Sequence, residues 1–288
     1  MSSFVIEGGH LIFTPDEKAS FLKDEPSAAR FFRRLTGSEE YINGIERWCL
    51  WLHGISPAEL HAMPHVVERV RLVREMRLAS VKPATRKAAE TPWLFMEIKE
   101  PGSDFIIVPK VSSEQRRYVP LGFLHADTVP TDLAFFVPDA TLYHFGVLTS
   151  NVHMAWMRAV AGRLEMRYRY SAQIVYNNFP WPFECKMENG EWRIGDEGSA
   201  SSAPPRLCVE KISSTAQAIL DARAKYPDSS LADLYDELTM PPDLRKAHQE
   251  NDRAVMAAYG FSTKMTESEC VAELFKRYQK LVAKGKDQ

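Results

Sequence analysis

The sequence contains few cysteines, and their spacing excludes the usual metal frameworks. The 288-residue chain has four cysteines, which lie far apart and form no C-x-x-C pair: Cys49, Cys185, Cys208 and Cys270. No zinc framework is therefore predicted. Widely spaced single cysteines are typical of reduced, mostly buried thiols, so we expect a cytoplasmic protein.

Long apolar runs are also missing. No segment approaches the ~18 consecutive apolar residues that a membrane-spanning helix needs. The start of the chain, "MSSFVIEGGHLIF", lacks the basic stretch and the long apolar core of a secretory signal. We expect neither membrane contact nor secretion.

A strong net charge is absent as well, but the charge is unevenly distributed. The formal net charge is −2, so no global field marks the protein as a nucleic-acid binder. Residues 66–90, in contrast, carry seven Lys and Arg against three acids. Arg71, Arg74 and Arg77 recur every three residues within a helical pattern, which predicts one basic strip on that helix.

The sequence lacks the loops that methyl transfer and phosphate chemistry need. No predicted strand is followed by G-x-G, and neither a phosphate loop nor a G-x-S-x-G elbow occurs. Adenine amino-methyltransferases hold a flipped base on an Asn-Pro-Pro-aromatic loop, and "NNFPWP" (177–182) has a related composition. Trp181 separates its two prolines, however, so the backbone cannot form the same turn. Methyl transfer by this chain alone is not predicted.

A nuclease site is an alternative. "PD" (15–16) and "EIK" (97–99) supply the parts of a PD…ExK motif. Asp16 and Glu97 would bind magnesium, and Lys99 would help to activate water. About 80 residues separate the two halves, and short matches of this kind are common by chance.

The order of predicted elements favours an α+β fold, because strands lie in the middle of the chain and helices at both ends. Residues 1–55 are predicted as a helical lead-in and residues 56–186 as a mixed helix and strand domain. Residues 187–205, rich in Gly, Ser and Pro, are predicted as a linker or loop, and residues 206–288 as a small helical domain. Strand-like runs are "WLFMEI" (93–98), "DFIIVPKV" (104–111), "LAFFVP" (133–138) and "LYHFGVLTS" (142–150).

Several helix ends are predicted from capping patterns. Thr14 and Glu17 have the spacing of a capping box. Pro242 and Gly260 mark the first turn and the end of another helix. Residues 150–162 are expected to form a helix that is capped at its polar start.

The segment "GRLEMRYRYS" (162–171) has the pattern of an extended chain, in which alternate residues face the same way. Glu165, Arg167 and Arg169 would then project from one side. The intervening apolar and aromatic side chains would anchor the segment on a core: Leu164, Met166, Tyr168 and Tyr170. The alternative is an ordinary solvated strand with a salt bridge.

Four long stretches carry a family resemblance: "GSEEYINGIERWCLWL" (37–52), "VSSEQRRYVPLGFL" (111–124), "HMAWMRAVAGRLEMRYRYSAQIVYNNFPWP" (153–182) and "LYDELTMPPDLRKAHQENDRAVMAAYG" (234–260). On these stretches the chain resembles the C-terminal part of MmeI-like (type IIL) restriction–modification enzymes and related adenine-specific DNA methyltransferases. The resemblance implies a DNA target-recognition domain over residues 56–186, closed by "NNFPWP", and a helical C-terminal domain.

The resemblance also implies roles for single residues. Glu165 and Arg167 match a pair of positions that reads one base pair. Arg169 matches a residue that helps to read another base pair, together with a position at Leu133 or Ala134. Phosphate contacts are expected from Ser112, Ser113, Arg116, Arg117, Arg77, Lys82, Arg86 and Lys87.

These observations predict sequence-specific recognition of double-stranded DNA by a fragment of a type II restriction–modification enzyme or adenine-N6 DNA methyltransferase. No cofactor is expected in this chain. S-adenosylmethionine is expected in a methyltransferase core, upstream in the same polypeptide or in a separate subunit. Two alternatives stay open: the magnesium-dependent nuclease, and a protein–protein docking module for a methyltransferase subunit.

Overall fold

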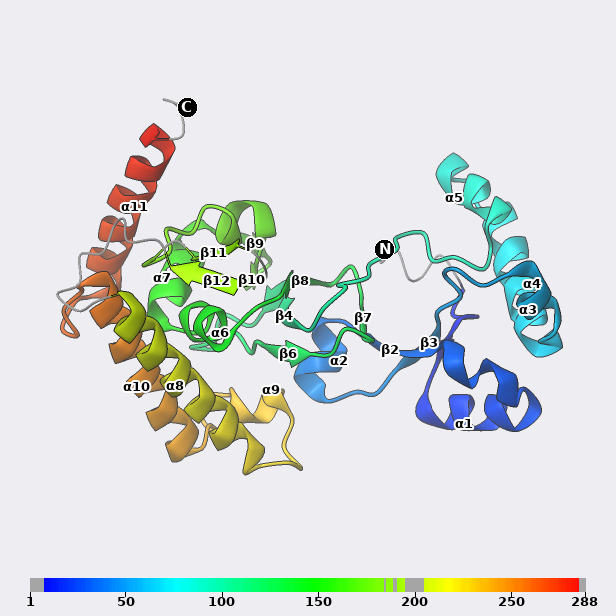
Figure 1. Ribbon diagram of the computed structural model, residues 1–288, viewed down its shortest axis with the longest axis horizontal. Coiled ribbons are helices and arrows are strands. Elements are labelled where there is room, and N and C mark those ends of the chain that lie inside the picture. The colour runs from blue at the N-terminus through cyan, green and yellow to red at the C-terminus, as the bar shows by residue number, and fades with distance from the viewer. Residues whose placement is uncertain (1–7, 184, 189–190, 195–204, 285–288) are drawn as a thin grey trace. The chain divides into compact units, whose positions relative to one another are not determined.

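The computed structural model describes residues 8–183, 185–188, 191–194 and 205–284. The chain forms two compact units: unit 1 comprises Met1–Val108 and Phe123–Pro138, and unit 2 comprises Pro109–Gly122 and Asp139–Gln288 (Figure 1). The predicted α+β class with a helical C-terminal region is confirmed. The predicted division at residues 55, 186 and 205 stays a prediction.

Unit 1 contains two small β-sheets. The first has the order β1-β3-β2-β7, in which β7 pairs parallel with β2 and the other pairs are antiparallel. Its strands are β1 (Ile12–Phe13), β2 (Phe32–Thr36), β3 (Trp48–Leu50) and β7 (Val129–Pro130). The second has the order β6-β4-β8 and consists of β4 (Phe105–Pro109), β6 (Gly122–Leu124) and β8 (Ala134–Pro138). The strands predicted in "DFIIVPKV" and "LAFFVP" are confirmed.

Helix α1 of unit 1 begins at the predicted capping box. Thr14 Oγ1 accepts a hydrogen bond from the backbone N–H of Glu17, and the Glu17 carboxylate accepts one from the N–H of Thr14, which confirms the capping box. The helices are α1 (Pro15–Asp24), η2 (Pro26–Phe31), α2 (Ser38–Asn43), α3 (Pro57–His61), α4 (Pro64–Leu78), α5 (Pro83–Lys87) and η3 (Ala88–Glu90), where η2 and η3 are 3-10 helices.

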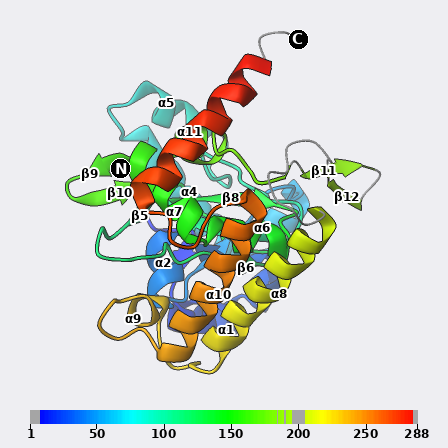
Figure 2. The same ribbon diagram turned by 90° about the vertical axis from the view of Figure 1, so that its left-hand side faces the viewer.

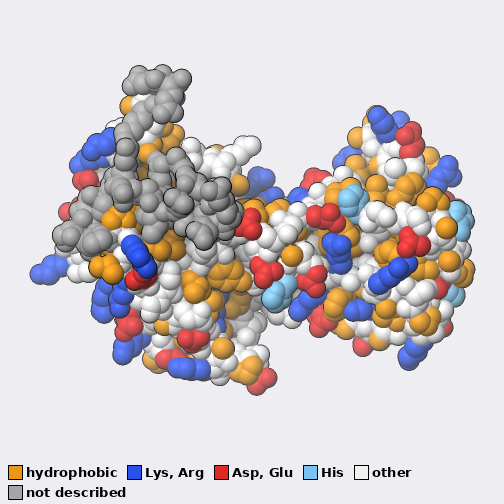
Figure 3. Space-filling view, in the orientation of Figure 1, with side chains coloured by type: hydrophobic (Ala, Val, Ile, Leu, Met, Phe, Trp, Pro, Cys, Tyr) orange, Lys and Arg blue, Asp and Glu red, His pale blue; other side chains and the backbone are white. Residues whose placement is uncertain are grey.

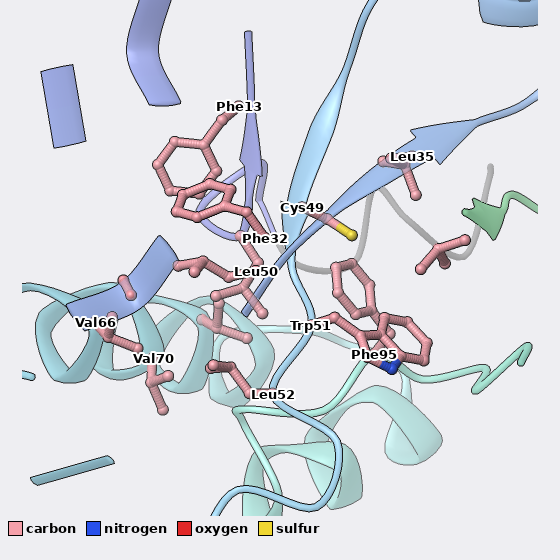
Figure 4. Packing of buried hydrophobic residues seen from close by; sticks show 14 of the residues in the cluster. Phe13, Phe32, Leu35, Cys49, Leu50, Trp51, Leu52, Val66, Val70 and Phe95 are labelled. Carbon is pink, nitrogen blue, oxygen red and sulfur yellow. The ribbon is translucent and has the colours of Figure 1, made fainter. Parts of the chain in front are cut away.

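The core of unit 1 lies between the first sheet and α4 (Figure 4). Phe13 and Phe32 meet edge to face with ring centroids 5.0 Å apart. Trp51 stacks on Phe95 at 5.5 Å. Residues 93–98 form no strand, contrary to the prediction. Their aromatic side chains instead pack as a loop on the sheet, so apolar content alone misled the strand prediction.

Unit 2 combines a three-stranded sheet with long helices. The sheet has the order β5-β10-β9, with β5 (Val111–Ser112), β9 (Gly162–Leu164) and β10 (Arg167–Arg169), and all its pairs are antiparallel. The helices are α6 (Leu142–Leu148), α7 (Asn151–Val160), the π-helical turn η4 (Ala172–Tyr176), α8 (Pro205–Ala224), α9 (Leu231–Leu234), α10 (Pro242–Tyr259) and α11 (Glu267–Lys284). Helices α8 and α10 lie side by side (Figure 2).

Part of the predicted linker at 187–205 is paired. β11 (Cys185–Glu188) and β12 (Glu191–Ile194) form an antiparallel two-stranded sheet, and residues 195–204 lie outside the described part of the chain. Ser150 caps the start of α7 as expected, but α7 ends at Val160 and the predicted end residue, Gly162, begins β9. Gly260 closes α10 as expected, with a left-handed φ of 70°. Within the described residues, no helix is long and apolar enough to cross a lipid bilayer.

The strand expected at residues 142–150 is instead helix α6. Its residues from Tyr143 to Leu148 are all buried, so the segment is apolar on every side, and a short buried helix and a buried strand then have the same pattern. Gly146 lets α8 approach closely, because a Cβ there would lie 2.6 Å from Cγ2 of Ile212. The Asn251 amide of α10 donates to the Gly146 carbonyl at 2.7 Å.

Buried polar groups connect the helices of unit 2 to the segment after β5. The Tyr118 hydroxyl donates to Asp252 Oδ2 at 2.7 Å, and the backbone N–H of Asn151 donates to Asp252 Oδ1 at 2.8 Å. Burial raises the pKa of Asp252 to about 6. His248 stacks on Tyr118 with ring centroids 4.2 Å apart, and its Nε2 lies 2.7 Å from the Tyr235 hydroxyl.

Two histidines of this core stay uncharged at neutral pH because they are buried. Desolvation lowers the pKa of His153 to about 3, and it lowers the pKa of His248 well below its usual value. The unfolded chain binds a proton at each of these positions below pH ~6.5, whereas the folded protein does not. Their contribution to stability is therefore present above pH ~6.5 and is lost as the pH falls. Asp252 acts in the opposite direction, because its raised pKa means that the folded state binds its proton more tightly. Its contribution to stability therefore increases as the pH falls from the folded to the unfolded pKa.

We predict that His248→Gln reduces the pH dependence of stability. Between pH 6 and pH 4.5, the free energy of unfolding should change by about 1.4 kcal/mol less per pH unit than in the unmodified chain, because one proton-linked group is lost. Urea unfolding at several pH values measures this slope. His125→Gln, which changes an exposed histidine, is the control. An unchanged slope in His248→Gln would contradict the assignment of a buried neutral imidazole.

Candidate nucleic-acid interface

The segment with the strongest sequence signal folds as a β-hairpin at the edge of unit 2 (Figure 2). β9 and β10 are joined by a two-residue turn formed by Glu165 and Met166, and Leu164 pairs with Arg167 across the turn. Glu165 has a left-handed φ of 56°. In two-residue hairpins of type II′ the first turn position has positive φ and is usually glycine, so Glu165 occupies a strained backbone position.

The extended rail predicted for this segment is therefore wrong in part. Tyr168 and Tyr170 are buried and anchor β10, as expected, and Arg167 and Arg169 are exposed. Leu164 and Met166 are not anchors: both are exposed at the tip. The chain reverses direction at Glu165 and Met166, where an extended chain was predicted. The prediction missed this turn because it lacks the Asn or Gly that usually mark two-residue turns.

Tyr170, the residue that follows β10, forms one hydrogen bond to helix α7 and one to the segment before β5. The Tyr170 hydroxyl lies 2.7 Å from Nε2 of His153, which is fully buried. The backbone N–H of Tyr170 donates to the Lys110 carbonyl at 2.8 Å, just before β5. Phe179 packs edge to face on His153, with ring centroids 4.4 Å apart. The exposed arginines of β10 thus belong to a strand that is held by contacts on its buried side.

Arg163 is a residue of this hairpin that the sequence analysis missed. Its guanidinium lies 3.8 Å from the centroid of the Tyr168 ring, and its Nη1 donates to the Met166 carbonyl at 2.9 Å. The pairing of Arg163 with Tyr168 depends on the turn, so an extended-chain pattern gave no signal for it. Arg163 fixes the turn from the face opposite to Arg167.

Glu165 and Arg167 form an ion pair at the tip, with Arg167 Nη2 2.9 Å from Glu165 Oε2. Both side chains are largely exposed, so the pair contributes at most about 1 kcal/mol to stability. The carboxylate can only accept hydrogen bonds, and the guanidinium can only donate them. The tip therefore presents a donor and an acceptor group side by side, and a ligand can take over either partner at little energetic cost.

The segment from Ser112 to Arg117 lies in the same unit. Ser112 pairs with Tyr168 in the sheet and shares its inward face. The Ser112 side chain is buried, so the phosphate contact predicted for its hydroxyl is wrong. Ser113 accepts a hydrogen bond from the N–H of Gln115 and begins a turn that leads to Arg116 and Arg117. Arg116 is half-buried and Arg117 is exposed.

The other predicted contacts lie in unit 1. Arg77 is fully buried, and its guanidinium donates to the backbone carbonyls of Ala88, Thr91 and Leu94. Its predicted phosphate contact, and its place in a basic strip, are therefore wrong: the side chain holds the loop after α5. The guanidinium of Arg71 is engaged in ion pairs with Glu68 and Glu75.

Helix α5 and its N-cap retain their exposed basic residues, Lys82, Arg86 and Lys87. Arg86 donates to the carbonyls of Ser80 and Val81 at 2.9 Å. Basic and acidic side chains are interspersed over the face of unit 1 that Figure 3 shows. This distribution favours local phosphate contacts rather than a broad basic surface.

Leu133 and Ala134 have different environments. Ala134 is buried with Phe105 and Ile107, so its predicted role in base reading is wrong. Leu133 is exposed, and its carbonyl accepts a hydrogen bond from Ser38. Of the two alternatives, Leu133 is the one whose side chain can contact a ligand.

The nuclease alternative gains no geometric support. Asp16 lies in the first turn of α1, and Glu97 pairs with Lys99 at 3.1 Å. Within the described ranges, no three His, Cys, Asp or Glu residues gather as they would around a metal ion. "NNFPWP" has a structural role: Asn178 donates to the carbonyls of Gln173 and Ile174, and the Pro180 carbonyl accepts from Tyr259 of α10.

Comparison with known proteins gives two family matches. The family described as "MmeI, target recognition domain" matches residues 1–183, and the family described as "MmeI, C-terminal domain" matches residues 206–284. The chain is 35% identical over 275 residues to DNA methyltransferase A of Bacillus subtilis (strain 168), covering 96% of this chain and 29% of that protein.

A solved structure of the type IIL restriction-modification enzyme MmeI in complex with DNA has the same fold, with a TM-score of 0.84 and 42% sequence identity. The match covers 96% of this chain and 34% of that chain. This chain thus spans about a third of the length of the relatives it matches.

We predict that Glu165→Gly stabilises the protein, because glycine adopts a left-handed φ without strain. The free energy of unfolding should exceed that of Glu165→Gln by about 1 kcal/mol. Both substitutions remove the carboxylate charge, so their difference reports the backbone. Urea unfolding measures it, and Met166→Gly, where φ is not left-handed, should destabilise. Equal stability of Glu165→Gly and Glu165→Gln would show that the turn stores no strain.

Proposed function

The chain belongs to the family of MmeI target recognition domains, joined to an MmeI C-terminal domain, and from this premise we propose that it recognises a specific sequence in double-stranded DNA. The observation that carries the proposal is the exposed ion pair of Glu165 and Arg167 at the tip of an anchored hairpin. A two-stranded β-ribbon fits the major groove of B-DNA, where each base pair shows a distinct pattern of donors and acceptors.

Glu165 and Arg167 together suit one C·G pair. Cytosine offers its N4 amino group as a donor in the major groove, and a carboxylate can accept from it. Guanine offers O6 and N7, and a guanidinium can donate to both. The opposite charges of the two side chains also limit the cost of desolvating Glu165 in a groove lined by phosphates.

Arg169 would help to read a second base pair. It lies two residues along β10 from Arg167, which places the two side chains on one face about 6.6 Å apart. That spacing is close to two base-pair steps. The family resemblance also gives Leu133, in unit 1, a role in base reading.

Phosphate contacts would come from the remaining polar and basic groups that reach the surface. Ser113, Arg116 and Arg117 belong to unit 2, and Lys82, Arg86 and Lys87 belong to unit 1. Such contacts position a protein on duplex DNA without reading its sequence.

The chain would work with a methyltransferase core, either in the same polypeptide or as a separate subunit. That core would bind S-adenosylmethionine and methylate adenine at N6, with or without an endonuclease. In that setting the protein acts on DNA in the bacterial cytoplasm.

We predict that reversing the polarity of the tip exchanges the preferred base pair. Glu165→Lys with Arg167→Asp should change the preference from C·G to G·C, because the lysine donates to guanine and the aspartate accepts from cytosine. Each lost pairing should cost roughly 1–3 kcal/mol, or about one to two decades in preference. Either single substitution should only weaken binding. Each variant is fused to its methyltransferase core, and the methylated sites are identified by sequencing.

The control for this swap is Arg206→Glu with Glu210→Arg, which reverses an exposed ion pair on α8. The control should keep the original motif. If the double swap at the tip also keeps it, or alters a position other than one C·G pair, the assignment of this pair to base reading is refuted.

We predict that Arg116→Ala with Arg117→Ala weakens binding to all duplexes alike. Two lost phosphate contacts should reduce the slope of log K against log salt by about 2. Fluorescence anisotropy with specific and random duplexes over a range of salt concentrations measures this. The control, Arg206→Ala with Lys211→Ala, removes the same charge from α8 and should change neither the affinity nor the salt dependence. Unchanged affinity of the Arg116 and Arg117 variant at low salt would mean that these side chains do not face DNA.

A further inference from the structure

The hairpin tip carries two apolar side chains that the base-reading ion pair does not explain. Leu164 is 43% exposed and Met166 is 71% exposed. Their neighbours on the hairpin are charged or aromatic, and the aromatic one is buried. Apolar side chains that stand in water at the tip of a charged hairpin gain free energy only when a ligand covers them.

Leu164 lies on the same face as the arginines of β10. It is the cross-strand partner of Arg167, and paired residues of an antiparallel ladder point to the same side. Arg163 pairs with Tyr168 on the opposite, inward face. Gly162, the partner of Arg169, leaves open space beside it. The outer face therefore presents Leu164 next to two guanidinium groups.

Two contacts also restrain the turn at the tip. Arg163 donates to the Met166 carbonyl at 2.9 Å, and Arg167 binds the Glu165 carboxylate at 2.9 Å. The two residues of the turn are thus fixed from both faces of the hairpin. Leu164 and Met166 are presented without the loss of backbone freedom that a flexible loop would suffer on binding.

The charge of the hairpin selects the kind of ligand. Residues 162–169 carry three arginines and one glutamate, which gives 3 − 1 = +2. A polyanionic ligand with apolar groups inside its binding surface fits this arrangement. In the major groove of DNA, the group of that kind is the 5-methyl group of thymine.

We propose that Leu164 and Met166 contact the thymine 5-methyl group of a base pair next to the C·G pair that Arg167 addresses. The proposal rests on the function proposed above. Paired residues at a hairpin end have Cα atoms about 5.5 Å apart, and successive base pairs are stacked ~3.4 Å apart. Leu164 therefore reaches one or two steps from the pair that Arg167 reads. The apolar tip adds a thymine-specific position to the recognised sequence.

The test selects bound duplexes from random libraries with the 288-residue chain and sequences them. One library is synthesised with dTTP and the other with dUTP, which lacks the methyl group. With the unmodified chain, T should be enriched at a pair adjacent or nearly adjacent to a selected C·G pair. In the dUTP library that enrichment should fall about fourfold, the effect of one buried methyl group.

The variant is Leu164→Ser with Met166→Ser, at two exposed positions. It should show the same fall of about fourfold in the dTTP library, and no further fall in the dUTP library, because the contact is already lost. Selection of the C·G pair should persist, which shows that the variant is folded and bound. Leu238→Ser, which changes a 95% exposed leucine between α9 and α10, should select as the unmodified chain does.

Three outcomes would overturn the proposal while the C·G pair is still selected. The first is the absence of a T preference near that pair, and the second is an equal T preference in both libraries. The third is an unaltered T preference in the variant that carries Leu164→Ser and Met166→Ser. If that variant keeps its T preference but loses binding to a methyltransferase core, the tip is a protein-docking surface. If the unmodified chain selects no sequence at all, the proposed DNA recognition itself has failed.

Discussion

The hairpin of β9 and β10 depends on the contact between Tyr170 and His153. β10 is three residues long and is the central strand of a sheet of three short strands, and a sheet of this size needs packing against a helix or a core to be stable. The buried hydrogen bond from Tyr170 to α7, together with the buried Tyr168 ring, fixes the strand on its inward side. Because alternate residues of a strand face opposite ways, the same register directs Arg167 and Arg169 outward. Two buried tyrosines thereby position two exposed guanidinium groups.

In this arrangement the residues that stabilise the hairpin differ from those that it exposes to a ligand. The buried side of the hairpin contributes apolar area and hydrogen bonds, whereas the exposed ion pair of Glu165 and Arg167 contributes little to folding. Substitutions at the tip therefore change its exposed hydrogen-bonding groups without removing the buried contacts that hold the hairpin. The strained φ of Glu165 fits the same view, since a glutamate is kept at a position where glycine would be more stable.

The sequence predicted those features that depend on local chemistry. The capping box at Thr14, the closing Gly260 and the buried tyrosines of residues 162–171 all follow from short-range rules, and the structure contains them. The reversal at Glu165 and Met166 could not be predicted, because the turn lacks the Asn or Gly residues that usually mark a two-residue hairpin, and the pairing of Arg163 with Tyr168 exists only once the turn has formed. Arg77 could not be placed from local sequence either. The helical period predicts it on a charged strip, but its guanidinium is buried and donates to three backbone carbonyls of a later segment.

The two family matches meet within one compact unit. Residues 109–122 and 139–183 belong to the stretch matched by the recognition-domain family, and residues 206–284 belong to the C-terminal family, yet both lie in unit 2. Asp252 of α10 binds Tyr118 and the start of α7, and α11 packs Phe275 against Trp156 of α7. Helix α7 is the support to which Tyr170 is bonded. The C-terminal helices therefore complete the base on which the hairpin stands, so a chain cut at residue 183 would lose the packing that holds Glu165 and Arg167 in position.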